Sequence, residues 1–227
     1  MTLTVVFTTI IALLFAYFLT YSRHFENKLH KVIFYLPNVL PSVVVALIWV
    51  FVFDGENGSL NALLKVFGIN LGSFYWLGDG RTALLSLVLP SLWASVGFNM
   101  FIFMNAMSSV PKSLYEESDL NGATFFQKLR YITAPLIMPV IRVAILFMIL
   151  GALKSFDLVM ILTNGGPSGA TDVIALYIYQ IAFGSGTGKF NFGYASALGM
   201  LLFLIIELIS RAGKKIFGSD DDTTAQY

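Results

Sequence analysis

Five apolar stretches, each long enough to cross a lipid bilayer, constrain the fold of this chain more than any other feature. They cover residues 1–22, 32–53, 82–109, 136–162 and 190–210, and the first three contain no charged residue. About 20 apolar residues in a helix cross the ~30 Å hydrocarbon core, where every backbone polar group must be paired internally. Charged residues make up only 12% of the 227 residues, which is about half of their share in soluble domains. We therefore predict an all-α, polytopic membrane protein with five transmembrane helices.

The segments between these stretches have the composition of connections. Residues 54–81 contain several Gly, Asn and Asp turn signals around a short apolar run that suits an interfacial helix. The basic loop at 23–31 holds both histidines, His24 and His30. A metal pair is one interpretation, but no third ligand is close in sequence, so we favour a solvated loop and predict no metal site. The tail 211–227 ends in D-D-D-T-T-A-Q-Y and is predicted to be disordered.

The distribution of lysine and arginine predicts the orientation in the membrane. Residues 23–31, the polar stretch 110–135 and the tail together hold nine of these cations, and the opposite side holds three. The two groups are Arg23, Lys28, Lys31, Lys112, Lys128, Arg130, Arg211, Lys214 and Lys215, against Lys65, Arg81 and Lys189. Because cytoplasmic loops carry the excess of Lys and Arg, residues 110–135 are predicted to be cytoplasmic.

That polar stretch between the third and fourth spans has an internal pattern of its own. Leucine, isoleucine and phenylalanine recur among its charged residues at spacings that suit short amphipathic helices. Gly122 lies where such a helix would end or turn. A solvated connector is the simpler interpretation. We favour an element that docks on a cytoplasmic partner, with Glu116 placed to pair with a basic group of that partner.

The same stretch carries a family resemblance. It reads E-E-S-D-L-N-G-A-T-F-F-Q-K-L-R-Y-I-T-A-P-L-I-M-P, and it resembles the signature of the membrane-spanning permease subunit of carbohydrate-type, binding-protein-dependent ABC importers. The matching positions are Glu116, Gly122, Ala123, Pro135, Leu136 and Pro139, and the departures are Glu117, Ser118 and Asn121. Three further segments are similar to spans of that family, namely F-Y-L-P-N-V-L-P-S-V-V-V-A-L-I-W, S-F-D-L-V-M-I-L-T-N-G-G-P and F-N-F-G-Y-A-S-A-L-G-M.

The resemblance implies a role and a set of partners. It implies half of a transmembrane pathway for a sugar or related solute, completed by a second, different permease subunit. It also implies two ATP-binding subunits, an extracytoplasmic solute-binding protein and a multi-pass location in a bacterial-type plasma membrane. ATP and Mg²⁺ would be bound by the partner subunits, so this chain would be no enzyme and need no cofactor. Family members usually have six spans, so a chain with five is expected to lack the first.

The resemblance also assigns expected roles to residues, in three groups. The coupling element that contacts the ATPase would consist of Glu116, Glu117, Asp119, Asn121, Gly122 and Ala123. Pro135 and Pro139 would form the hinge from this loop into the fourth span. Gly165, Gly166 and Pro167 form a tight turn on the outer side, where the solute-binding protein would dock.

Polar residues within the spans are candidates for the pathway, because a charge in lipid costs about 2.5–3.5 kcal/mol or more. Lys154 and Asp157 are three residues apart, so we expect them to share a helix face, where they pair or line the pathway. Asn99 and Asn105 are expected to bond a neighbouring helix or a solute hydroxyl.

Other classes of function stay open at this point. A self-contained secondary transporter or channel is the alternative, but we find no inverted repeat that would favour it. A membrane-embedded enzyme is disfavoured, since the chain shows no catalytic constellation, and the absence of a G-x-x-x-x-G-K-[ST] motif argues against ATP binding. A net charge of +1 gives no reason to expect nucleic acid as a partner.

Overall fold

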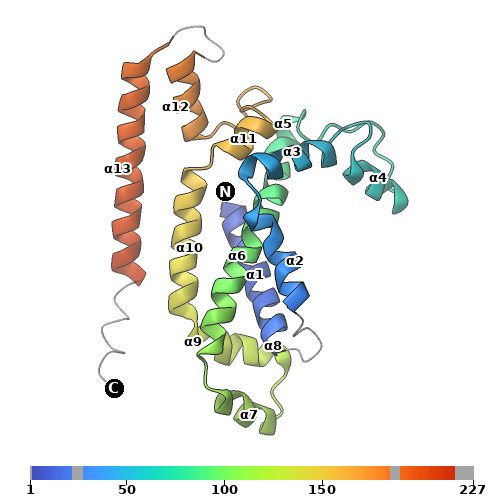
Figure 1. Ribbon diagram of the computed structural model, residues 1–227, viewed down its shortest axis with the longest axis vertical. Coiled ribbons are helices and arrows are strands. Elements are labelled where there is room, and N and C mark those ends of the chain that lie inside the picture. Colours follow the sequence, from blue (N-terminus) through green and yellow to red (C-terminus); the bar gives the residue numbers. More distant parts are fainter. Residues whose placement is uncertain (1, 22–27, 185–189, 218–227) are drawn as a thin grey trace. The chain divides into compact units, whose positions relative to one another are not determined.

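The computed structural model describes residues 2–21, 28–184 and 190–217, and within them every regular element is a helix (Figure 1). Most are α-helices, and η1 is a π-helical segment. Their bounds are α1 Thr2–Tyr21, α2 Lys28–Val39, α3 Ser42–Val52, α4 Ser59–Val66, α5 Gly80–Ser86, α6 Val88–Ser108, α7 Lys112–Leu120, α8 Phe125–Lys128, η1 Leu129–Thr133, α9 Ala134–Leu136, α10 Met138–Leu153, α11 Asp157–Leu162, α12 Ile174–Phe183 and α13 Phe192–Phe217. His24 and most of the predicted tail lie outside the described residues.

The helices that are long and apolar enough to cross a membrane agree with the predicted fold class. Within the part of the chain that the structure describes, three helical segments qualify alone, and two sharply bent helix pairs raise the total to five if each pair counts as one span. The single segments are Thr2–Tyr21, Gly80–Ser108 and Phe192–Ile216; the bent pairs are Lys31–Val39 with Ser42–Val52 and Phe125–Leu136 with Met138–Leu153. The prediction of an all-α, polytopic membrane protein is therefore confirmed.

The second predicted span, residues 32–53, is not straight. Helices α2 and α3 meet at an angle of 103°, and the break falls at Leu40 and Pro41. A proline disfavours helical conformation in the residue before it and lacks the amide hydrogen that would continue the helix. The carbonyl of Pro41 then accepts the amide of Val45 at 3.1 Å, as α3 begins.

Two further boundaries differ from the sequence prediction. The predicted fourth span, 136–162, ends at Leu153, because the amides of Lys154 and Ser155 bond the carbonyls three residues back and close the helix. The predicted disordered tail is wrong over its first residues, since α13 continues without a break to Phe217. By contrast, the short helix expected between residues 54 and 81 is present as α4.

The described residues divide into two compact units. The first unit comprises residues 40–94 and 150–209, and the second comprises residues 2–39, 95–149 and 210–217. In the first unit α3 packs against α11, and Ala46 and Leu176 are fully buried in its core.

The connection between α3 and α5 in the first unit is held together by the amide side chain of Asn61. Asn61 of α4 donates hydrogen bonds to the carbonyls of Gly55 and Phe74, at 2.9 and 3.1 Å. Its oxygen accepts the indole N–H of Trp76 at 2.8 Å. The side chain thus joins three separate parts of this connection.

The second unit is built around close contact between α1, α2 and α6. Ala12 and Ala16 of α1 are fully buried, and Thr8 bonds the hydroxyl of Ser95 on α6 at 3.1 Å. A Cβ at Gly97 of α6 would collide with the backbone carbonyl oxygen of Phe34. The backbones of α2 and α6 are therefore in direct contact, which only a glycine permits at this position.

Candidate functional site

Helix α7, which carries the predicted coupling residues, ends as its sequence predicts. Gly122 adopts a φ of +71°, the left-handed conformation that glycine tolerates best. Its amide bonds the carbonyl of Asp119 at 3.0 Å, and the amide of Ala123 bonds that of Ser118 at 3.0 Å. These two bonds form a Schellman motif, which satisfies the last carbonyls of α7 and fixes the exit of the chain.

The next helix begins only a few residues later and is fixed by a capping box. The hydroxyl of Thr124 accepts the amide of Gln127 at 3.4 Å, while the Gln127 side chain accepts the amide of Thr124 at 2.7 Å. An ion pair between Lys128 and Asp119 closes the turn between α7 and α8. The lysine side chain is 16% exposed and the aspartate side chain 64%, so water screens this pair as it does other surface ion pairs.

One face of α7 packs onto the core of the second unit. The hydroxyl of Tyr115 bonds the hydroxyl of Thr133 in η1 at 2.8 Å, and Thr133 is fully buried. The ring of Tyr115 also lies 4.5 Å from that of Tyr21, at the end of α1. Tyr21 in turn donates its hydroxyl to the carbonyl of Met107 in α6, at 3.3 Å. Helix α7 is thereby tied to α1, α6 and η1.

The opposite face of α7 is open to solvent. Glu116 and Glu117 are exposed, and the side chain of Leu120 is 90% exposed. After α7, a hollow of about 350 Å³ is lined by residues of the turn and of the following helical segments, among them Asn121 and Tyr131. Two carboxylates next to an exposed leucine are suited to contact a surface that is partly basic and partly apolar.

Removal of the Tyr115–Thr133 hydrogen bond is expected to loosen α7 without unfolding the unit. In a double-mutant cycle with Tyr115→Phe and Thr133→Val, we expect a coupling energy of about 1 kcal/mol in thermal or denaturant unfolding. Ser109→Ala in the loop before α7 is the matched control, since its hydroxyl bonds only the local carbonyl of Ala106. A coupling energy near zero would show that the bond does not anchor α7.

The predicted loop-to-span hinge coincides with a bend. The axes of Phe125–Leu136 and of α10 differ by 76°, and Ile137 lies at the break, between Pro135 and Pro139. Pro139 lacks the amide that would continue the hydrogen bonds across the break. The two prolines therefore flank the bend, and movement at this point stays a prediction.

The polar residues predicted for the pathway lie in unlike environments. Asn99 is buried and donates to the carbonyl of Ser95 one turn back in α6, at 2.9 Å, whereas Asn105 is exposed. The expected common helix face of Lys154 and Asp157 is wrong, because α10 ends before the lysine and α11 begins at the aspartate. Asp157 instead accepts a hydrogen bond from the hydroxyl of Ser42 at 2.8 Å.

The predicted outer turn is a tightly bonded loop in the first unit. Gly165 has a φ of +83°, and a Cβ there would collide with the carboxylate of Asp172. The buried hydroxyl of Thr171 bonds the carbonyl of Gly166 at 2.8 Å and the hydroxyl of Thr163 at 2.7 Å. Gly165, Gly166 and Pro167 are thus held in one conformation by a threonine that the sequence pattern did not single out.

Sequence reasoning also missed three residues around α7. Tyr115, Thr133 and Lys128 hold the helix in place, yet none of them matches the family signature. Their partners are nine or more residues away in sequence, so helical periodicity does not reveal the contacts. The sequence did hold one indication of the anchored face, because Tyr115 and Ser118 are three residues apart and so lie on the same side of the helix.

Comparison with known proteins gives one consistent result. The model of the family described as "Binding-protein-dependent transport system inner membrane component" matches residues 5–217. The probable ABC transporter permease protein YurN of Bacillus subtilis is 35% identical over 187 residues, which are 82% of this chain and 63% of that protein. The diacetylchitobiose uptake system permease protein NgcF of Streptomyces coelicolor is 33% identical over 76% of this chain and 48% of its own length. This chain thus spans less than two thirds of the curated relatives it matches.

A solved structure shares the fold. It is the crystal structure of a bacterial ABC transporter involved in the import of the acidic polysaccharide alginate, with a TM-score of 0.77 and 25% sequence identity. The match covers 95% of this chain and 75% of that chain.

Proposed function

The chain belongs to the family of inner membrane components of binding-protein-dependent transport systems, and we propose that it is the permease subunit of an ATP-driven ABC importer. In this proposal it forms half of a translocation pathway, together with a second permease subunit. The importer includes two ATP-binding subunits, one of which contacts α7 from the cytoplasm, and a solute-binding protein that docks on the outer side. The solute is a sugar or oligosaccharide. This choice is supported by the names of similar proteins, which belong to transport systems for sugars or polysaccharides.

One observation carries the coupling role: α7 has one face anchored and the other exposed. Tyr115 on the anchored face contacts η1 and α1, and Tyr21 of α1 extends the connection to α6, whereas the exposed face presents Glu116 and Leu120. A short helix is only marginally stable alone, so these contacts let it move as one body with α1 and α6. A force applied by an ATP-binding subunit to the exposed face would then reach the spans.

Reconstitution into lipid vesicles tests this proposal against a self-contained carrier. We expect uptake of a labelled oligosaccharide only when the chain is assembled with its second permease and ATPase subunits, with ATP inside the vesicle and the binding protein outside. The chain alone is expected to give no uptake above empty vesicles. Solute transport by the purified chain without nucleotide would exclude the importer role and support a secondary transporter or channel.

A further inference from the structure

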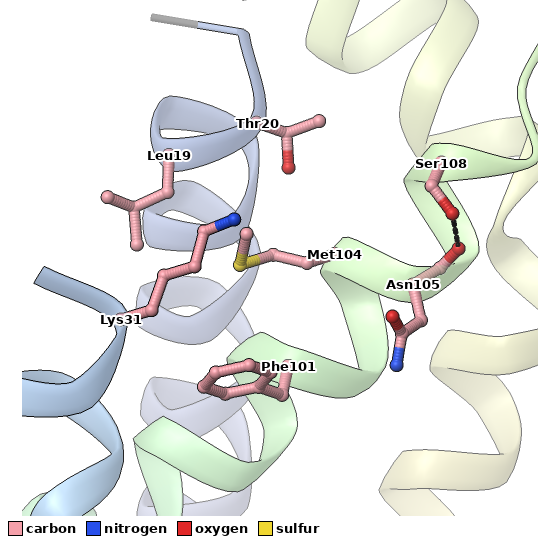
Figure 2. A pocket seen from close by; sticks show the side chains of 7 residues that line it. All are labelled: Leu19, Thr20, Lys31, Phe101, Met104, Asn105 and Ser108. Carbon is pink, nitrogen blue, oxygen red and sulfur yellow. Dashed lines mark hydrogen bonds between the residues drawn. The ribbon is translucent and has the colours of Figure 1, made fainter. Parts of the chain in front are cut away.

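The second unit contains a polar hollow that the proposed coupling role does not use. It has a volume of about 440 Å³ and is lined by α1, α2 and α6 (Figure 2). Lys31, Asn105, Thr20 and Ser108 supply its polar groups, and its apolar wall includes Met104. None of the described lining residues is acidic. The hollow therefore carries a positive charge that no described carboxylate in its wall offsets.

The hydrogen bonds within the wall show which groups can still donate. The hydroxyl of Ser108 donates to the carbonyl of Asn105 at 2.6 Å, and that of Thr20 donates to the carbonyl of Ala16 at 2.7 Å. Figure 2 shows the amino group of Lys31 reaching from α2 toward α1 and α6. Among the described residues, neither the Lys31 ammonium nor the Asn105 side-chain amide has a hydrogen-bond or ion-pair partner, so both remain as donors for a bound group. An ammonium and an amide that line the same hollow favour an anion with several acceptor oxygens.

The position of the hollow along the helices indicates its depth. Thr20 and Ser108 belong to the last turns of α1 and α6, both of which are candidate membrane spans. Thr20 precedes Tyr21, whose ring packs against Tyr115 of α7. The hollow therefore lies at the same end of the second unit as α7, where spans reach the headgroup layer. On the proposed function, this is the inner, anionic leaflet.

We propose that the hollow binds the phosphate of an anionic phospholipid, with Lys31 pairing with the phosphate and Asn105 donating its amide hydrogens. Basic pockets between transmembrane helices on the cytoplasmic side are suited to such headgroups. A lipid fits better than a free anion, because Phe101 and Met104 give the hollow an apolar wall and Val32, next to Lys31 on α2, is 59% exposed. These side chains offer an apolar surface to the acyl chains of a lipid whose headgroup is held by Lys31.

Thermal unfolding of the full chain in nanodiscs tests this inference. We expect phosphatidylglycerol in a phosphatidylcholine disc to raise the midpoint of wild-type unfolding by several degrees. Lys31→Gln is expected to lose most of that increment, and Asn105→Ala about half of it. Lys65→Gln, which removes an equivalent charge from exposed α4, is the matched control and should retain the whole increment.

Two results would overturn the inference. The first is an equal phosphatidylglycerol increment in wild type, Lys31→Gln and Asn105→Ala; if one variant fails to fold, the other decides alone. The second is an equal increment from inorganic phosphate added to wild type in phosphatidylcholine alone, which would identify a site for a free anion. The measurement uses no ATPase and no solute, so its failure is distinct from a failure of the importer proposal.

Discussion

Replacement of Glu116 by arginine is expected to abolish ATP-driven uptake by the assembled importer while the chain itself stays folded. Glu116 is exposed on α7, and it is a position at which the chain matches the family signature. On our proposal its carboxylate pairs with a basic group of the ATP-binding subunit. Reversal of one charge in a buried pair costs about 2–5 kcal/mol, which corresponds to an affinity lower by roughly 30-fold or more. We expect co-purification of the ATP-binding subunit to fall accordingly.

The matched control for this substitution is Glu56→Arg in the outer connection of the first unit. Glu56 is also exposed and accepts a hydrogen bond from the hydroxyl of Tyr75 at 3.3 Å. We expect Glu56→Arg to leave ATPase co-purification unchanged, because this connection lies on the outer side in our proposal. Normal uptake and normal co-purification in Glu116→Arg would contradict the assignment of α7 as the coupling element.

The second large effect is expected from Gly97→Ala, which should destabilise the chain. The added methyl group would collide with the backbone carbonyl oxygen of Phe34, and backbone cannot move aside as a side chain does. Overpacking of this kind costs typically about 1–3 kcal/mol and occasionally more. We expect a loss near the upper end, seen as a lower midpoint of thermal unfolding in detergent.

Gly151→Ala provides the control for this prediction. Gly151 is also helical, and a Cβ there would meet nothing within 4 Å. Alanine is favoured over glycine in a helix by up to about 1 kcal/mol, so this variant should match or exceed the wild type in stability. Equal unfolding midpoints for both variants would show that the contact between α2 and α6 is looser than described.

The sequence predicted those features that depend on local chemistry. The turn at Gly122 follows from the freedom of glycine to adopt positive φ, and the long apolar helices follow from their length and composition. The chain bends by 103° at Pro41, between α2 and α3. A proline shows where a helix is weakened, but the angle is set by packing against other elements.

The features that the sequence did not predict depend on contacts between distant residues or on helix ends. Lys154 and Asp157 were expected on one helix face because an unbroken helix was assumed. The helix closes before the lysine, and Asp157 bonds Ser42, which is 115 positions away. The pairing of Lys128 with Asp119 likewise requires the chain to reverse at Gly122. Neither contact can be predicted from the spacing of residues within a single helix.

On the proposed function, the separation of the anchored face of α7 from its exposed face has a consequence for how permease subunits diversify. The groups that hold the helix, Tyr115, Ser118 and Asp119, are different residues from those that face outward, Glu116 and Leu120. Substitutions on the exposed face can therefore accumulate without disturbing the contacts that anchor α7. On the proposed function, a duplicated copy of this chain would bind a different ATP-binding subunit after changes at a handful of surface positions, with its membrane-spanning helices unchanged.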